Sequence, residues 1–129
     1  MESRNCRTYG HGPFRVAVVH GGPGAPGSAA PVARELAADR GAIEPLQTAV
    51  TLDGQVDELV ATIVANGDPP MALVGHSWGA WLALIVAAEH PRLVSRLVLV
   101  SAGVFESRYT KDLLTARLAR LDEAERAEA

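Results

Sequence analysis

The stretch from residue 71 to residue 91, MALVGHSWGAWLALIVAAEHP, constrains the fold more than any other part of the chain. A short apolar segment leads into the motif GHSWG at residues 75–79, and an apolar helical segment follows it. In a G-x-S-x-G motif with these flanks, a strand turns so tightly into a helix that the serine, here Ser77, projects alone above the sheet. The glycines avoid clashes with the neighbouring strand and helix. The sequence therefore predicts a nucleophile elbow, and the alternative is a glycine-bounded turn whose serine has no chemical role.

Length and charge narrow the function classes. The 129 residues are 48% hydrophobic and 21% charged, which is typical of one globular domain. Twelve Lys and Arg against 15 Asp and Glu leave a net charge of −3 with no basic run, so we expect no nucleic-acid or membrane partner. A small organic substrate fits this composition better. The single Cys6 cannot form an intramolecular disulfide, and the first residues lack the apolar segment of a secretion signal, so a cytoplasmic protein is expected.

Alternating strand and helix patterns predict an α/β fold. Short apolar runs bounded by glycine and proline predict strands, and segments with apolar residues at helical spacing predict the helices between them. Right-handed crossovers place helices on both faces of a parallel sheet and so give a three-layer sandwich. We expect about four strands in the order 2-1-3-4. In chain order, the expected strands are residues 15–20, 42–47, 71–74 and 94–102, and the expected helices are 31–40, 51–66, 78–88 and 107–129.

A glycine-rich loop, HGGPG at residues 20–24, follows the first expected strand. Its glycines and proline disfavour both helix and strand, so a shaped loop is expected. HGGPG upstream of GHSWG resembles the α/β-hydrolase superfamily, and within it the proline-iminopeptidase-like branch, where the two motifs occur together. The resemblance covers about residues 15–102. It implies a truncated α/β-hydrolase fold whose strands are the third to sixth of the family's usual eight.

The domain organisation follows from this resemblance. We expect a single α/β-hydrolase-like domain over residues 1–129, with its sheet core at residues 15–102. The chain lacks an obvious first β-hairpin and ends before the family's last two strands. The last expected helix, residues 107–129, corresponds to the start of the family's cap. Its apolar residues, which are predicted to face inward, are Leu113, Leu114, Leu118 and Leu121.

Two backbone N–H groups are needed to stabilise the negative oxygen of a tetrahedral intermediate at Ser77. One should come from Trp78, because it follows the serine and lies at a helix N-terminus. Pro23 has no N–H to donate. The resemblance implies Gly22 as the second donor, because the family uses the HGGPG loop to line this site.

The serine also needs a base, and no histidine in the sequence is an evident one. His76 precedes Ser77 and is expected to face away from it and pack, because successive residues at a strand end point to opposite sides. His20 is expected to orient the HGGPG loop by hydrogen bonds, although it is the histidine most plausibly near Ser77. His90 is expected to be a solvated helix cap, and His11 to be exposed. In the superfamily the triad follows the order Ser, Asp or Glu, His, which places the missing histidine beyond residue 129.

Glu106 is a candidate triad acid, since some members of the superfamily carry the acid just after the strand that is here residues 94–102. The alternative is a solvated glutamate at the start of a helix. No His, Cys, Asp and Glu cluster has metal-ligand spacing, and neither GxxxxGK[ST] nor G-x-G-x-x-G is present. We therefore expect no cofactor and no metal.

The leading hypothesis is a serine hydrolase that acts on an ester, or on an amide or N-terminal peptide bond. The second hypothesis is a truncated, catalytically incomplete hydrolase half that folds or oligomerises without turnover. A serine at position 77 argues against the dehalogenase and epoxide-hydrolase branches, whereas a cofactor-free haloperoxidase or a carbon–carbon bond hydrolase would share the elbow. The strand at 94–102 is apolar on both faces and would be an exposed edge, so a homo-oligomer is expected. Its simplest form is a homodimer paired through this strand, and the alternative is an exchange of the helices at 107–129 that covers the edges.

Overall fold

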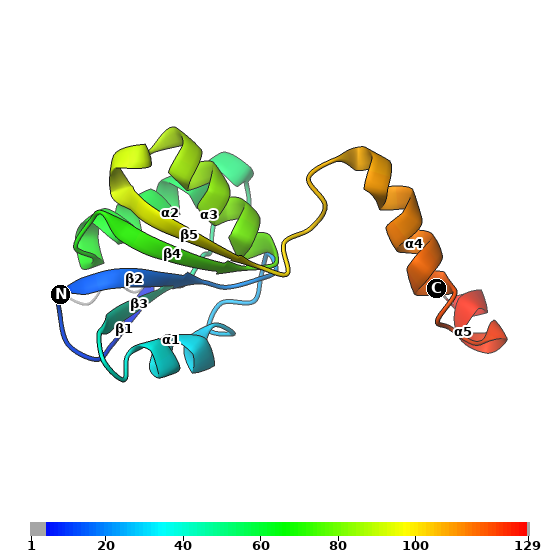
Figure 1. Ribbon diagram of the computed structural model, residues 1–129, viewed down its shortest axis with the longest axis horizontal. Helices are drawn as coiled ribbons and strands as arrows, with labels where there is room; N and C mark the ends of the chain where they lie inside the picture. Colours follow the sequence, from blue (N-terminus) through cyan, green and yellow to red (C-terminus); the bar gives the residue numbers. More distant parts are fainter. Residues whose placement is uncertain (1–4, 129) are drawn as a thin grey trace.

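The computed structural model describes residues 5–128, which form a five-stranded sheet with helices on both faces (Figure 1). The order of the strands across the sheet is β1-β3-β2-β4-β5. β1 is antiparallel to β3, and every other neighbouring pair is parallel. The strands are β1 (Cys6–Tyr9), β2 (Phe14–Val19), β3 (Gly41–Pro45), β4 (Met71–His76) and β5 (Val94–Val100). The helices are α1 (Ala30–Leu36), α2 (Leu52–Asn66), α3 (Trp78–Glu89), α4 (Thr110–Leu118) and α5 (Glu123–Glu128), with 3-10 turns η1 (Pro91–Leu93) and η2 (Ser107–Tyr109).

The predicted α/β class and the predicted order of the parallel strands are confirmed, because β3-β2-β4-β5 is the order 2-1-3-4 of the sequence analysis. The edge strand β1 was not predicted. It is four residues long and polar at its centre, where Arg7 and Thr8 pair with Glu44 and Ile43 of β3. A strand this short and polar carries no apolar run that periodicity could detect.

The two faces of the sheet are covered unequally. α2 and α3 pack on one face, where their buried residues meet those of the strands, for example Leu59 and Leu82 against Leu73. The shorter α1 covers the other face over β2 and β3, with Ala33 against Val18. Alternation along β2 explains this division, since successive side chains of a strand point to opposite faces. Among the described residues, no helix combines the length and apolar character needed to cross a bilayer.

α2 shows how local sequence sets an element. Thr51 caps its N-terminus, because the side-chain oxygen accepts a hydrogen bond from the Gly54 N–H at 3.1 Å. Apolar residues at helical spacing form the expected inner face, with Val56, Leu59 and Ile63 buried on the side that faces the sheet, whereas Val64 is 62% exposed. These residues recur at intervals of three and four, which is the spacing of one helical face.

The prediction of one continuous helix over residues 107–129 is wrong. The segment forms η2, α4 and α5, and Figure 1 shows α4 extending away from the sheet. The break has a local cause, because Asp122 and Glu125 form a reciprocal capping box, each accepting the other's backbone N–H at 2.9 Å, and so start a new helix. Three of the four leucines predicted to face inward do not do so, since Leu114 is 59% exposed and Leu113 and Leu118 are also exposed, whereas Leu121 is half-buried. Ala129 lies outside the described residues.

β5 is the exposed edge that the sequence predicted. Among the described residues it pairs with β4 alone, so the N–H and C=O groups along its other side have no strand partner. Val98, Leu99 and Val100 are exposed on it, Val98 at 48%. An apolar strand edge of this kind is a template for pairing with another chain.

Candidate active site

The strand-to-helix turn at Ser77 has the strained geometry of a nucleophile elbow. Ser77 has φ 53° and ψ −115°, a backbone conformation that non-glycine residues rarely adopt. Its N–H donates to the carbonyl oxygen of Val100 at 2.9 Å, which ties the turn to the end of β5. The tight strand-to-helix turn that the motif predicts is therefore present, and the backbone of Ser77 is strained in it. Such strain persists only where surrounding contacts hold it.

The two flanking glycines are required by close approach, as the motif predicts. A Cβ atom at Gly79 would meet the backbone of β2 and of the loop that follows, at the carbonyl oxygens of Val19 and, at 2.5 Å, of His20. A Cβ atom at Gly75 would meet the carbonyl oxygen of Gly79. Both obstacles are backbone atoms, which cannot rotate away. Positions 75 and 79 therefore have no space for a side chain, because β2, the elbow and α3 are in close backbone contact there.

The HGGPG loop lies against the elbow. A Cβ atom at Gly21 would stand 3.4 Å from the Ser77 Cβ and 3.1 Å from the His76 Nδ1. The next residue, Gly22, has φ 121°, and a Cβ there would lie 2.5 Å from the Gly24 backbone nitrogen. Only glycine fits such a position. Gly21 is thus the loop residue that lies against Ser77, and Gly22 follows it directly in the chain.

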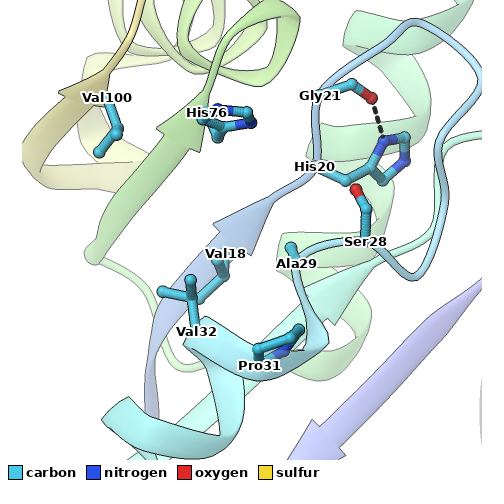
Figure 2. Close-up of a pocket in the computed structure, with 9 residues that line it drawn as sticks. All are labelled: Val18, His20, Gly21, Ser28, Ala29, Pro31, Val32, His76 and Val100. Carbon is cyan, nitrogen blue, oxygen red and sulfur yellow. Dashed lines mark hydrogen bonds between the residues drawn. The ribbon is translucent and has the colours of Figure 1, made fainter.

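His20 orients this loop through both of its ring nitrogens. The side chain is 1% exposed. Its Nε2 accepts the N–H of Gln47 at 3.0 Å, and its Nδ1 is 2.7 Å from the Gly21 carbonyl oxygen (Figure 2). A backbone N–H can only donate, so Nε2 carries the lone pair and Nδ1 carries the proton that Gly21 accepts. This agrees with the expected loop-orienting role, and it leaves no ring nitrogen free to act as a base.

Trp78 occupies the first position of α3, where backbone N–H groups have no partner within the helix. Its indole Nε1–H donates to the Oε1 atom of Gln55 on α2 at 2.7 Å. Gln55 and Gln47 are buried polar residues that the sequence analysis did not single out. Gln55 directly precedes Val56 in the apolar stripe of α2, and a glutamine beside such a stripe was the available signal.

A cavity of about 290 Å³ opens beside the loop at the carboxyl ends of β2, β4 and β5 (Figure 2). Its walls are mostly apolar, and His76 stands at its rim. His76 was expected to pack away from solvent, and this is wrong, because its side chain is exposed at the end of β4 where no helix covers the sheet. The lining residues are Val18, His20, Gly21, Ser28, Ala29, Pro31, Val32, His76 and Val100.

The remaining candidates lie elsewhere. Glu106 is exposed and forms an ion pair with Arg108 at 2.8 Å, and within residues 5–128 no hydrogen bond or ion pair connects Glu106 to the elbow. His90 caps the opposite end of α3 and is half-buried, and His11 is exposed as predicted. No group of three or more His, Cys, Asp or Glu side chains in the described part of the chain could hold a metal ion.

Glu58 of α2 fixes the connection that follows β3. Its carboxylate accepts the backbone N–H of Thr48 at 2.8 Å, the Thr48 hydroxyl at 2.6 Å, the N–H of Ala49 at 3.0 Å and the amide of Asn5 at 3.0 Å. Burial raises the pKa of Glu58, but these hydrogen bonds outweigh burial and lower it below its usual value. Glu58 thereby holds the segment that carries Gln47 towards His20.

Comparison with known proteins places these features in a family context. The family model described as "alpha/beta hydrolase fold" matches residues 40–123. Lipase LipV of Mycobacterium tuberculosis is 36% identical over 80 residues, which are 61% of this chain and 31% of LipV. Putative carbamate hydrolase RutD of Klebsiella pneumoniae is 35% identical over 73 residues, 57% of this chain and 27% of RutD.

The solved structure of VinJ superposes with a TM-score of 0.81 at 22% identity, and the match covers 95% of this chain and 47% of VinJ. That likeness concerns the fold. The chain spans about a third or less of the length of the curated relatives named above, and about half of VinJ.

Proposed function

The chain belongs to the alpha/beta hydrolase fold family, and on that premise we propose that it is a serine hydrolase that cleaves an ester through Ser77. The observation that carries this proposal is the backbone of Ser77, which has φ 53° at the turn between a strand and a helix. It is flanked by Gly75 and Gly79, where an added Cβ atom would clash with backbone atoms. Strain of this kind exposes a hydroxyl and serves no packing purpose. The similarity to the lipase LipV agrees with ester chemistry.

The proposed reaction begins with attack of the Ser77 hydroxyl oxygen on the ester carbonyl carbon, while the hydroxyl proton passes to a base. The carbonyl oxygen becomes negative in the tetrahedral intermediate. The backbone N–H groups of Trp78 and Gly22 are the proposed donors to that oxygen. Support comes from the free N-terminal position of Trp78 on α3, whose dipole favours negative charge, and from the contact of the neighbouring Gly21 with Ser77.

The substrate proposed is a small ester with an apolar group. The support is the mostly apolar cavity beside the HGGPG loop, with Val18, Val32 and Val100 in its walls. The pair of motifs HGGPG and GHSWG additionally favours the proline-iminopeptidase-like branch, so an N-terminal peptide bond is the variant substrate to test. Glu106 receives no role here, because Arg108 already pairs with its carboxylate at the surface.

The base is the part of the mechanism that residues 5–128 leave open. Among them, no hydrogen bond joins a histidine to the Ser77 hydroxyl, and His20 has both nitrogens committed. We propose that the chain forms a homodimer through β5, in which a histidine of the second copy can approach the elbow. The exposed Val98, Leu99 and Val100 and the unpaired outer side of β5 support this pairing.

The alternative function is a folded hydrolase half without turnover, and the absence of a histidine bonded to Ser77 within residues 5–128 favours it. Hydrolysis of a p-nitrophenyl ester by the chain and by Ser77→Ala separates the two. Without a base, we expect at most the roughly 10³- to 10⁴-fold acceleration over water that binding and oxyanion donors provide, and Ser77→Ala should remove the share that depends on the nucleophile. Equal rates for both proteins would refute the hydrolase proposal.

A further inference from the structure

We propose that Gln47 and Gln55, together with His20, form a buried hydrogen-bonded bridge that positions the two sides of the oxyanion site relative to each other. The inference rests on the proposed function, because it concerns the same site. The two glutamines would be positioning residues and would not touch the substrate. They act on Trp78 at one end of the bridge and on the HGGPG loop at the other.

The bridge is continuous from the elbow to the loop. The indole of Trp78 donates to Gln55 Oε1 at 2.7 Å, and the Nε2 of Gln47 donates to the backbone carbonyl oxygen of Gln55 at 3.3 Å. The backbone N–H of Gln47 donates to His20 Nε2 at 3.0 Å, and the Nδ1–H of His20 donates to Gly21 O at 2.7 Å. A further bond from Gln55 Nε2 to Ala49 O, at 2.9 Å, fixes the Gln55 amide.

The bridge connects four separate elements. Trp78 begins α3, Gln55 belongs to α2, Gln47 follows β3, and His20 follows β2. Gln55 is 6% exposed and Gln47 is 4% exposed, so both amides are withdrawn from water, and the Gln47 Oε1 atom has no hydrogen-bond partner among the described residues. Burying a polar group costs free energy unless it is hydrogen-bonded, and an apolar side chain would fill the same space without that requirement. The two amides are therefore better explained by the geometry they impose than by packing.

Imposed geometry matters here because the oxyanion donors come from different elements. The ladder between β2 and β4 ends at the pair Val19 and Gly75, so Trp78 and the HGGPG loop both lie beyond it. Backbone contact at Gly79 limits how closely α3 approaches the loop, and the bridge adds directed hydrogen bonds between the two sides. Productive constellations must be held to within about 0.5 Å. His20 alone fixes only the loop side, since its two bonds end on Gln47 and Gly21. Gln55 supplies the link to the elbow.

The test uses a near-isosteric variant and two controls. Gln55→Met keeps the shape of the side chain and removes the acceptor for Trp78. Gln55→Glu keeps an acceptor for the indole and should preserve that bond. Thr62→Val is the matched control, because Thr62 lies on the same helix, is 5% exposed, and donates its hydroxyl to the carbonyl oxygen of Glu58 one turn away.

The kinetic readout is Ser77-dependent hydrolysis of a p-nitrophenyl ester. We expect Gln55→Met to lower kcat about tenfold or more with little change in KM, within the roughly hundredfold that a 1 Å misplacement can cost. Gln55→Glu should recover part of the loss, and Thr62→Val should leave kcat near that of the unaltered chain. Equal effects of Gln55→Met and Thr62→Val on kcat would overturn the inference.

A structural readout judges the bridge separately from activity. In nitrogen-15 NMR spectra, Gln55→Met should speed hydrogen exchange at the Trp78 indole and shift the amide resonances of Gly21 and Gly22, while the Trp81 indole stays unchanged. Thr62→Val should do neither. If Ser77→Ala retains the full rate, the proposed function fails, and these resonances then decide the bridge alone. Unmoved Gly21 and Gly22 resonances in Gln55→Met would contradict it.

Discussion

Gly79→Ala tests whether the elbow is wedged as tightly as its geometry indicates. The added methyl group would stand 2.5 Å from the His20 carbonyl oxygen and closer still to that of Val19. Both are backbone atoms at the carboxyl end of β2, which is paired on both sides within the sheet. The methyl group cannot turn away, so α3 must move off the sheet. Reaching an ordinary contact of 3.4 Å from the His20 oxygen requires a shift of about 0.9 Å, and clearing the closer Val19 oxygen requires slightly more.

The cost follows from what α3 buries. Leu82 and Val86 are 0% exposed against the sheet, and burying each contributes roughly 1.5–3 kcal/mol. A gap of 0.5–1 Å forfeits about a quarter to a half of the attraction between facing atoms. At a shift near 1 Å about half of that stabilisation is lost, so we expect Gly79→Ala to lower the free energy of unfolding by about 1.5–3 kcal/mol, within the range of about 1–3 kcal/mol for overpacking. A domain stable by only about 5–15 kcal/mol would show this plainly.

Urea unfolding followed by circular dichroism measures the loss. Gly12→Ala is the matched control, because a Cβ at Gly12 would lie 3.5 Å from the Phe14 ring, which is ordinary contact. The control should change the free energy of unfolding by less than about 0.5 kcal/mol. If Gly79→Ala cost no more than Gly12→Ala, the tight contact between α3 and β2 would be refuted.

The HGGPG loop, the hydrogen bonds of Glu58 and the exposed edge of β5 can each be tested by a single substitution. Gly21→Ala should lower Ser77-dependent hydrolysis with little loss of stability, because its methyl group would press on the neighbouring His76, at 3.1 Å from the side-chain Nδ1 and 3.3 Å from the backbone oxygen, and so displace the loop from Ser77; unaltered kinetics would contradict the loop assignment. Hydrogen bonds lower the pKa of Glu58, so its contribution to stability is present above its ordinary pKa and is lost as the pH falls through the lowered value. Glu58→Gln should therefore make the free energy of unfolding depend less on pH below about pH 4.5, as measured by urea unfolding midpoints across pH. Val98→Lys should reduce dimer mass in light scattering, whereas Val32→Lys, equally exposed on α1, should not; a monomeric unaltered chain would exclude the dimer.

Much of the sheet could be predicted because its strands are apolar and bounded by turn residues. The apolar runs that contain Val16 to Val19 and Leu73 predict buried strands, and these residues are buried. Because such strands alternate with amphipathic helices along the chain, a parallel sheet is predicted. β1 could not be found this way, because Arg7 and Thr8 occupy its centre and its pairing with β3 depends on the distant, buried Glu44. The end of α4 was not predicted, because leucines at helical spacing indicate one continuous helix, whereas the capping box of Asp122 and Glu125 starts a new one.

The elbow was predictable for a different reason, since Ser77 and its glycines satisfy a local steric requirement that the motif records. Its supports are not local. Gln55 and Trp78 are 23 residues apart, and Gln47 and His20 are 27 apart, so their hydrogen bonds become visible only once four elements are assembled. The prediction that His76 packs was wrong because alternation along a strand gives the face of the sheet to which a side chain points. Alternation does not say whether a helix covers that face.

The central claim is that Ser77 is a nucleophile, and the most direct measurement maps where a fluorophosphonate reacts. Attack by a serine oxygen on phosphorus expels fluoride and leaves a stable mass on the labelled residue, which peptide mass spectrometry locates. Ser101 is the internal control, because it shares a positive φ, at 49°, and is exposed at the end of β5 without the elbow's helix. We expect slow labelling at Ser77 that Ser77→Ala abolishes and Ser101→Ala leaves unchanged. Labelling that persists in Ser77→Ala, or that falls on Ser101, would contradict the account.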